Sequence, residues 1–275
     1  MKVVHMFMSR LLTILICALP VSVAAHEFWI EPETYQVEPG ERLQAVFKNG
    51  QEFEGSSLSF FERSSARFEM YADGQVMALT PRSGDSPALD VDAPVTDGLV
   101  SVVHETTPSL LTYREWEKFL KFAAHKDFKT AAADHIAAGW SQEIFRERYT
   151  RHVKALFAVG SGQGDDAATG METEFIALTN PYDAGFDNNM RVEVQYRGAP
   201  RADAQVEVFD RAPDNSVTIS LFRTDAAGQV SVPVQNGHEY LFDAVVLRSI
   251  PAPVAEENPL VWETLWAALT FKVPE

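Results

Sequence analysis

Short runs of alternating apolar and polar residues, with turn signals about every ten residues, constrain the fold of this chain more than any other feature. Apolar residues, mostly valines, occupy alternate positions in 192–196, 206–208 and 230–234. Residues 197–200 and 224–228 are rich in Gly, Pro, Asp and Ala and read as turns. A period of two is typical of strands with one buried face. The C-terminal part is therefore predicted to form an antiparallel β-sandwich.

The N-terminal part shows the same pattern. Residues 43–47 are a predicted strand, residues 58–62 and 67–71 alternate, and Ala72-Asp73-Gly74-Gln75 is a hairpin signal. Residues 98–104 form a further predicted strand, in which His104 shares a face with two valines. We therefore expect a second β region before residue 108.

The middle of the chain has a different periodicity. Thr112 and Glu115 match a capping box, and Trp116 begins an apolar pattern with helical spacing. A second helix is predicted from Ser141, with Glu147 and Arg151 as an i,i+4 pair. One further helical turn is expected at 262–266.

These patterns predict a mainly β chain: two antiparallel β-sandwich-like regions with a helical segment between them. The expected divisions are a signal peptide at 1–25, an N-terminal β region at 26–107, a helical segment at 108–160, a Gly-rich and acidic linker at 161–171, and a C-terminal sandwich at 172–275.

The first 25 residues have the order of a secretory signal peptide. Lys2 and Arg10 precede the mostly apolar run 11–19, and Val23 and Ala25 are the small residues of a cleavage site. We expect cleavage between Ala25 and His26 and a periplasmic or secreted mature protein. The only cysteine, Cys17, would leave with the signal peptide.

The net charge argues against a nucleic-acid partner, and the hydropathy argues against a transmembrane segment in the mature chain. Loss of Lys2 and Arg10, without loss of any acid, changes the formal net charge from −16 to −18. Nucleic-acid binding needs a basic surface, so no nucleic-acid partner is expected. The apolar run is shorter than the roughly 20 residues that span a bilayer, and no later segment approaches that length, so the mature chain should contain no transmembrane segment.

Cleavage would make His26 the first residue. A free α-amine and an imidazole on one residue can together chelate a transition metal such as Cu, Ni or Co. A second histidine would complete a histidine brace, and the expected partners are His104, at the end of a strand, and His125, near the end of the first helix. No local pair such as H-E-x-x-H is present, so the fold must bring these residues together.

No catalytic motif such as G-x-S-x-G occurs, and Gly162-Gln163-Gly164-Asp165 does not lie between a strand and a helix as a phosphate loop would. We therefore predict no catalytic residues and expect a binding protein rather than an enzyme.

Several motifs resemble one family along the whole mature chain. They are Ala25-His26-Glu27-Phe28-Trp29-Ile30-Glu31-Pro32, Arg146-Glu147-Arg148-Tyr149, Thr224-Asp225-Ala226-Ala227-Gly228, Gly237-His238-Glu239-Tyr240-Leu241 and Trp262-Glu263-Thr264-Leu265-Trp266. The chain resembles the secreted bacterial family catalogued as domain of unknown function 4198, DUF4198. The resemblance implies a C-terminal Ig-like sandwich and a periplasmic component associated with nickel or cobalt uptake.

Three functions follow as hypotheses. The leading one is a periplasmic transition-metal-binding protein that uses His26 and works beside a membrane uptake system. The alternative is a metal-free β-sandwich module that binds a protein or glycan. The third is a copper oxidase of the histidine-brace type.

Overall fold

The computed structural model describes residues 26–250 and 258–275. The predicted signal peptide lies outside the described residues, and His26 is the first residue within them. No described helix is long and apolar enough to cross a membrane.

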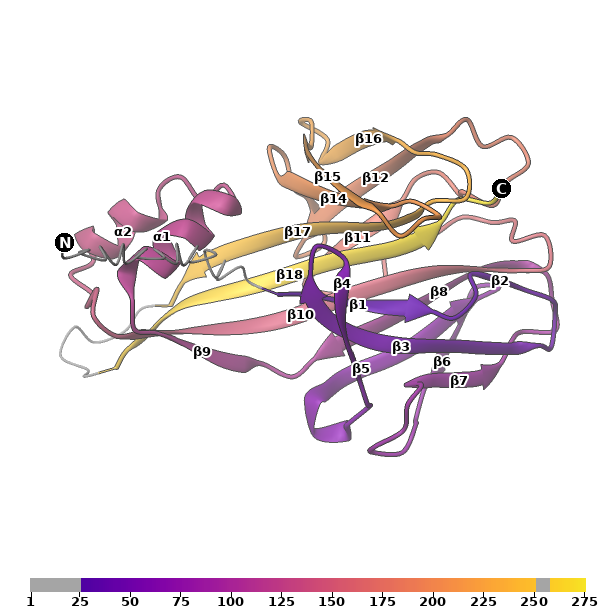
Figure 1. Cartoon of the computed structure of the whole chain (residues 1–275), viewed down its shortest axis with the longest axis horizontal. Helices are drawn as coiled ribbons and strands as arrows, with labels where there is room; N and C mark the ends of the chain where they lie inside the picture. The colour runs from indigo at the N-terminus through magenta and orange to yellow at the C-terminus, as the bar shows by residue number, and fades with distance from the viewer. Residues whose placement is uncertain (1–25, 251–257) are drawn as a thin grey trace, which may run out of the picture.

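The fold is mainly β, as predicted (Figure 1). The N-terminal part contains β1 (Glu27–Pro32), β2 (Gln36–Val37), β3 (Arg42–Gln51), β4 (Glu54–Leu58), the 3-10 turn η1 (Glu62–Ser64), β5 (Ser65–Ala72), β6 (Gln75–Ala78), β7 (Leu89–Asp92) and β8 (Gly98–Thr106). The middle contains β9 (Ser109–Tyr113), α1 (Trp116–His125), α2 (Ala131–Ala137) and β10 (Phe145–Val159). The C-terminal part contains β11 (Thr173–Ala177), β12 (Asn189–Tyr196), β13 (Ala199–Pro200), β14 (Gln205–Arg211), β15 (Val217–Arg223), β16 (Gln229–Pro233), β17 (Glu239–Ser249) and β18 (Leu260–Lys272).

One long sheet runs through the whole molecule. Its order is β15-β14-β17-β18-β10-β8-β5-β6, with β2 and β9 also paired to β10. The β10 and β18 strands pair in parallel, and the β17 and β18 strands pair antiparallel. Residues from both predicted β regions therefore share one hydrogen-bonded sheet.

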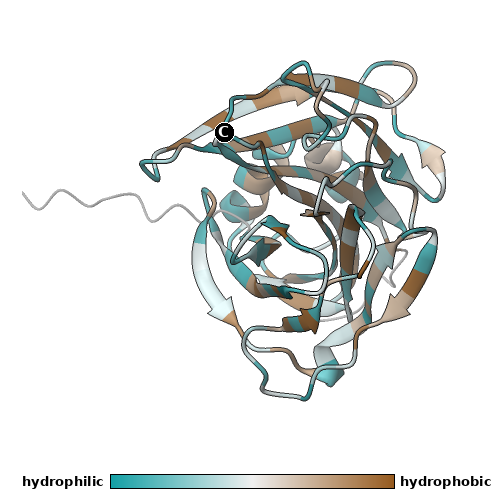
Figure 2. Cartoon of the chain, turned by 90° about the vertical axis from the view of Figure 1, so that its right-hand side faces the viewer, coloured by the Kyte–Doolittle hydropathy of each residue, from teal (hydrophilic) through white to brown (hydrophobic). Residues whose placement is uncertain are grey.

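Two smaller sheets cover this long sheet and complete two sandwiches. The sheet β1-β3-β4, with β7 on β3, covers a core that includes Trp29, Phe47 and Phe157. The sheet β11-β12-β13, with β16 on β12, covers a core that includes Phe175 and Phe242. Viewed along the strands, polar and apolar segments alternate on many ribbons (Figure 2), as expected where one face is buried. The strands of the C-terminal sandwich pair antiparallel within each of its two sheets, in agreement with the predicted antiparallel sandwich.

The two helices lie together at one end of the long sheet (Figure 1). Phe119 and Phe122 of α1 pack on Phe145, Trp262 and Trp266. The sequence predicted a helix at this position, but Thr112 belongs to β9 and makes no cap. The second helix of the structure is α2, which the sequence analysis missed.

Two helical predictions are wrong. Residues 145–159 form β10 rather than the helix predicted from Ser141, and 262–266 lie inside β18. Both strands are central and buried on both faces, so their apolar residues do not alternate. Several of the charged residues that they bury, such as Lys154 and Glu263, have ionic partners there.

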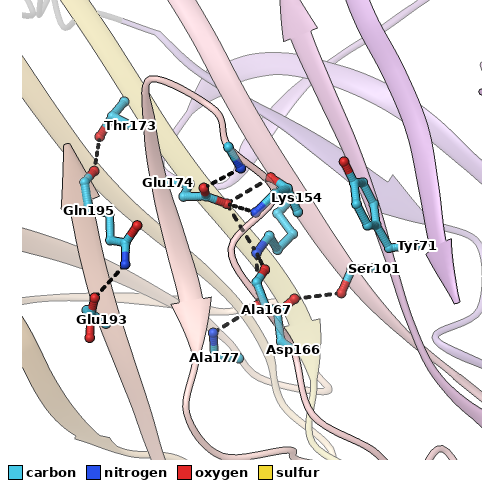
Figure 3. A network of polar contacts seen from close by, with 12 residues as sticks. Tyr71, Ser101, Lys154, Asp166, Ala167, Thr173, Glu174, Ala177, Glu193 and Gln195 are labelled. Atoms are coloured by element: carbon cyan, nitrogen blue, oxygen red, sulfur yellow. Dashed lines mark hydrogen bonds and ion pairs between the residues drawn. The ribbon is translucent and has the colours of Figure 1, made fainter. Parts of the chain in front are cut away.

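The clearest example of such a partner set is the buried Lys154 (Figure 3). Its Nζ lies 2.9 Å from Asp166 Oδ2 and 3.6 Å from Glu174 Oε2. Ser101 Oγ and the Ala177 N–H also donate to Asp166. The predicted linker 161–171 is irregular in structure, and through Asp166 it is attached to β10.

Candidate functional site

A pocket of about 570 Å³ opens beside His26, where the helical end meets the N-terminal sandwich. It lies between β1, β4, β9 and α1, with β10 and β18 as its floor. Its apolar walls are Phe28, Leu58, Leu111, Phe122, Tyr149 and Trp266. Its volume falls within the range of small-molecule sites, which is roughly 300–1,000 Å³.

His26 lies at this pocket, and the chain directly after it is fixed. His26 is exposed, whereas Glu27, Phe28, Trp29 and Ile30 are buried. The β1 strand pairs along its whole length with β3. Cleavage after Ala25 would therefore expose an amine on a residue whose neighbours are held by the core.

Arg151 holds the carbonyl group of His26 and also lines the pocket. Its Nη2 donates to the His26 carbonyl oxygen at 2.6 Å. Its guanidinium carbon lies 4.0 Å from the centroid of the Trp266 ring and 5.2 Å from that of Tyr149. Its Nη1 is buried and has no hydrogen-bond partner among the described residues. Burial lowers the pKa of Arg151, although the carboxylates of the region oppose this effect.

A chain of hydrogen bonds supports the floor of the pocket. Tyr113 donates to Glu147 at 2.9 Å, Thr264 donates to the other oxygen of Glu147, and Trp266 Nε1 donates to Thr264 at 3.0 Å. Burial raises the pKa of Glu147, while the two donors oppose that shift. These contacts fix the ring of Trp266 beneath the pocket.

A buried charge cluster lies at the start of β1. Lys126 Nζ lies 2.6 Å from Glu207, 2.8 Å from Asp243 and 3.7 Å from Glu27. Burial raises the pKa of Glu27 to about 7, with Lys126 as the opposing influence. Three carboxyl groups therefore share one lysine.

His125 lies at the solvent edge of this cluster. Its side chain is half-exposed, and its Nε2 lies 3.1 Å from Glu207 Oε1. The hydrogen bond to Glu207 raises the pKa of His125, which stabilises the protonated ring. A protonated imidazole cannot bind a metal ion, so metal binding by His125 would have to displace this proton.

His104 lies in the N-terminal core. Its ring packs against Phe28, Phe47 and Phe68, with centroid distances of 5.7, 4.2 and 5.5 Å. Its Nε2 lies 3.0 Å from Ser65 Oγ, and its Nδ1 is buried without a partner in the described part of the chain. Burial lowers the pKa of His104 to about 3, so the ring is neutral at physiological pH.

The structure thus brings His26 to the pocket, but neither His104 nor His125 lines it. Within residues 26–250 and 258–275, no group of three His, Cys, Asp or Glu side chains is arranged to hold a metal ion. The sequence did not predict that Arg151 lines the pocket or that Lys126 joins three buried carboxyl groups. Their only signal was a charged residue within or beside an apolar run.

The comparisons identify a family but no activity. The family model described as "Domain of unknown function (DUF4198)" matches residues 23–248. No curated protein matches the chain.

Two solved structures give weak similarities. One is titled "Crystal structure of tetra-tandem repeat in extending region of large adhesion protein", with 10% identity and a TM-score of 0.22 over 90% of this chain and 50% of that chain. The other is titled "D0-D1 domain of Intimin", with 10% identity and a TM-score of 0.21 over 90% of this chain and 97% of that chain. The chain therefore spans half the length of the first of these, and TM-scores this low do not bear on function.

Proposed function

The chain belongs to the DUF4198 family, and from its own pocket we propose that it is an exported protein that binds Ni, Co or Cu ions as cargo. In this proposal the signal peptide is cleaved after Ala25, the mature protein is periplasmic or secreted, and it works beside a membrane uptake system.

The position of His26 carries the proposal. Its carbonyl oxygen is bound to Arg151 at 2.6 Å, and the next residue, Glu27, is 3% exposed. The imidazole and the new amine would therefore be offered at the pocket from a fixed backbone, which reduces the entropy lost when a metal binds. Two nitrogen donors on one residue suit these metals.

Any further histidine ligand would have to come from outside the pocket lining. To bind the metal, His104 would have to leave its contacts with three phenylalanine rings, and His125 would have to break its hydrogen bond to Glu207. His125 is half-exposed and His104 is buried, so His125 is the second ligand in this proposal. Small molecules that enter the pocket with the metal could occupy the other coordination positions.

Calorimetry on correctly processed protein tests the mechanism. Protein that begins at His26 should bind Cu²⁺ or Ni²⁺ with a micromolar or lower dissociation constant. Binding should weaken as pH falls, because protons compete for the same lone pairs. One extra residue before His26 converts the His26 amine into a peptide amide and moves the free amine one residue away, so binding should weaken at least tenfold. His238→Ala is the matched histidine control, since His238 pairs with Asp210 elsewhere in the fold.

Two results would count against this function. Equal affinity with and without the extra residue would remove the His26 mechanism. No binding of any of the metals would favour the second candidate, a metal-free interaction module. The exposed Leu58 and Leu111 at the pocket support that candidate, because apolar side chains at a rim can contact a protein or glycan.

A further inference from the structure

Arg151 is a buried cation that lacks a bonded anion. It is 8% exposed, and no carboxylate oxygen of the described residues lies within 4.0 Å of its guanidinium nitrogens. The acceptor of its side chain is a neutral carbonyl, that of His26, and Nη1 has no partner in the described chain. Buried charges are normally paired, so this exception calls for an explanation.

The surroundings of Arg151 suit a planar anion. Trp266 and Tyr149 lie near its guanidinium group, which limits the orientations that the group can adopt. A guanidinium fixed in this way matches the two oxygens of a carboxylate with two parallel hydrogen bonds. A lysine at the same position would supply a point charge without that geometry.

The pocket beside Arg151 suits an apolar body. Arg151 and His26 both line it, and Phe28, Leu111 and Phe122 supply hydrophobic walls. The one carboxyl group of the lining is Glu147, which burial shifts toward its neutral form. Lys118 adds a second cation at the wall. Among the charged side chains that line the pocket, two cations therefore face one carboxyl group, while Asp243 and Glu27 lie outside the lining and act on Arg151 through the protein.

The overall negative charge is a weak obstacle. Exposed charges are screened over a Debye length of about 8 Å at physiological ionic strength. A contact with a desolvated guanidinium is screened much less. The pocket, rather than the net charge of the protein, decides which ligand binds.

We propose that the pocket binds an organic carboxylate whose carboxylate group pairs with Arg151 and whose apolar body packs against the pocket walls at Phe28, Leu58 and Leu111. This carboxylate is either a small free acid or the C-terminus of a peptide. Carboxylate binding at Arg151 does not require a metal ion at His26, so it can be tested separately from the proposed metal binding.

Paired probes test the charge directly. Phenylacetate and its amide, phenylacetamide, have nearly the same size and shape, and they differ in the group that would meet Arg151. We expect phenylacetate to bind the mature protein at least tenfold more tightly, as measured by calorimetry with a chelator present. A short peptide ending in phenylalanine, with a free or an amidated C-terminus, repeats the comparison and shows which source of carboxylate the pocket prefers.

Variants locate the effect. Arg151→Gln should abolish the preference for the acid over the amide. Arg148→Gln, on the same strand, should leave it intact, because Glu263 keeps Arg248 as its partner. Leu111→Trp should weaken binding of both probes at least tenfold by filling the pocket, and it changes a residue that is 41% exposed.

The proposal is overturned if neither acid binds more tightly than its amide in the mature protein. It is also overturned if folded Arg151→Gln keeps the preference. If Arg151→Gln does not fold, Leu111→Trp decides, since unchanged binding in that variant would place the ligand elsewhere.

Discussion

Replacing Lys154 should cost more stability than any surface change in this protein. The side chain of Lys154 is fully buried, and those of Asp166 and Glu174 are 1% exposed. Lys154→Met keeps the apolar stem and removes the charge, which leaves two buried carboxylates with neutral donors only.

The expected loss follows from the contacts of each acid. Asp166 retains bonds from Ser101 and Ala177, and Glu174 retains three bonds from Thr169 and Gly170. Neither acid retains a countercharge. Removing one partner of a buried ion pair costs about 3–5 kcal/mol. For a protein of this size each kcal/mol lowers the melting temperature by about 2–4 °C, so we expect a fall of about 6–20 °C.

Urea denaturation of mature protein, followed by tryptophan fluorescence at pH 7, measures this loss. Lys129→Met is the matched control, because its side chain is 72% exposed and lies 3.5 Å from Asp127. The control should change the free energy of unfolding by less than about 0.5 kcal/mol. Adding Asp166→Asn to Lys154→Met should recover part of the loss by removing one unpaired charge. A loss below about 1 kcal/mol for Lys154→Met would refute the reasoning.

Two further predictions concern pH and have opposite signs. The pKa of Glu27 is raised from 4.5 to about 7, so ionisation of Glu27 lowers the stability of the protein as pH rises through that window. Glu27→Gln should therefore stabilise the protein at pH 8 by about 1–3 kcal/mol and have little effect at pH 4. The pKa of His104 is lowered from 6.5 to about 3, so the protein loses stability as pH falls through that window, where the unfolded chain binds a proton that the buried ring does not. His104→Phe should remove this loss at pH 4. Urea midpoints of each variant at pH 4, 6 and 8 measure both effects. A variant whose pH profile matches that of the unmodified protein would contradict the corresponding assignment.

The predictable part of the fold is the part with one buried face. Strands β12 and β16 bury one face, and their alternation identifies them from the sequence. The hairpin at Ala72-Asp73-Gly74-Gln75 joins β5 to β6 as expected, with Asp73 and Gly74 both at positive φ. Local turn chemistry and the period of two were sufficient there.

The central strands could not be predicted, because their polar residues depend on distant partners. Glu147 in β10 is bonded to Thr264, which lies 117 positions away, and Lys154 is bonded to Asp166 in an irregular segment. No local sequence pattern predicts contacts between residues this far apart in the chain or in irregular segments. Without them, a polar residue within an apolar run indicates the exposed face of a helix.

The spacing of Glu147 and Arg151 shows why this error was natural. Four residues are close to one helical turn and are also two full periods of a strand. The pair therefore shares a face in either structure, and it does line one pocket in β10. The spacing correctly placed both residues on one face, but the predicted i,i+4 helical pair is wrong, because four residues of a strand span about 13 Å.

The same strand also indicates where function is to be sought. Of the charged residues buried on β10, Glu147 accepts bonds from two hydroxyl groups and Lys154 is paired with acids. Arg151 donates from its side chain to one neutral carbonyl, although it is buried almost as deeply. A fold that satisfies its other charges on this strand has no stability reason to leave this one incomplete, and departures from local consistency concentrate at functional sites. Because the residue that Arg151 holds is His26, the predicted first residue of the mature protein, the incomplete arginine and the predicted cleavage site point to the same pocket.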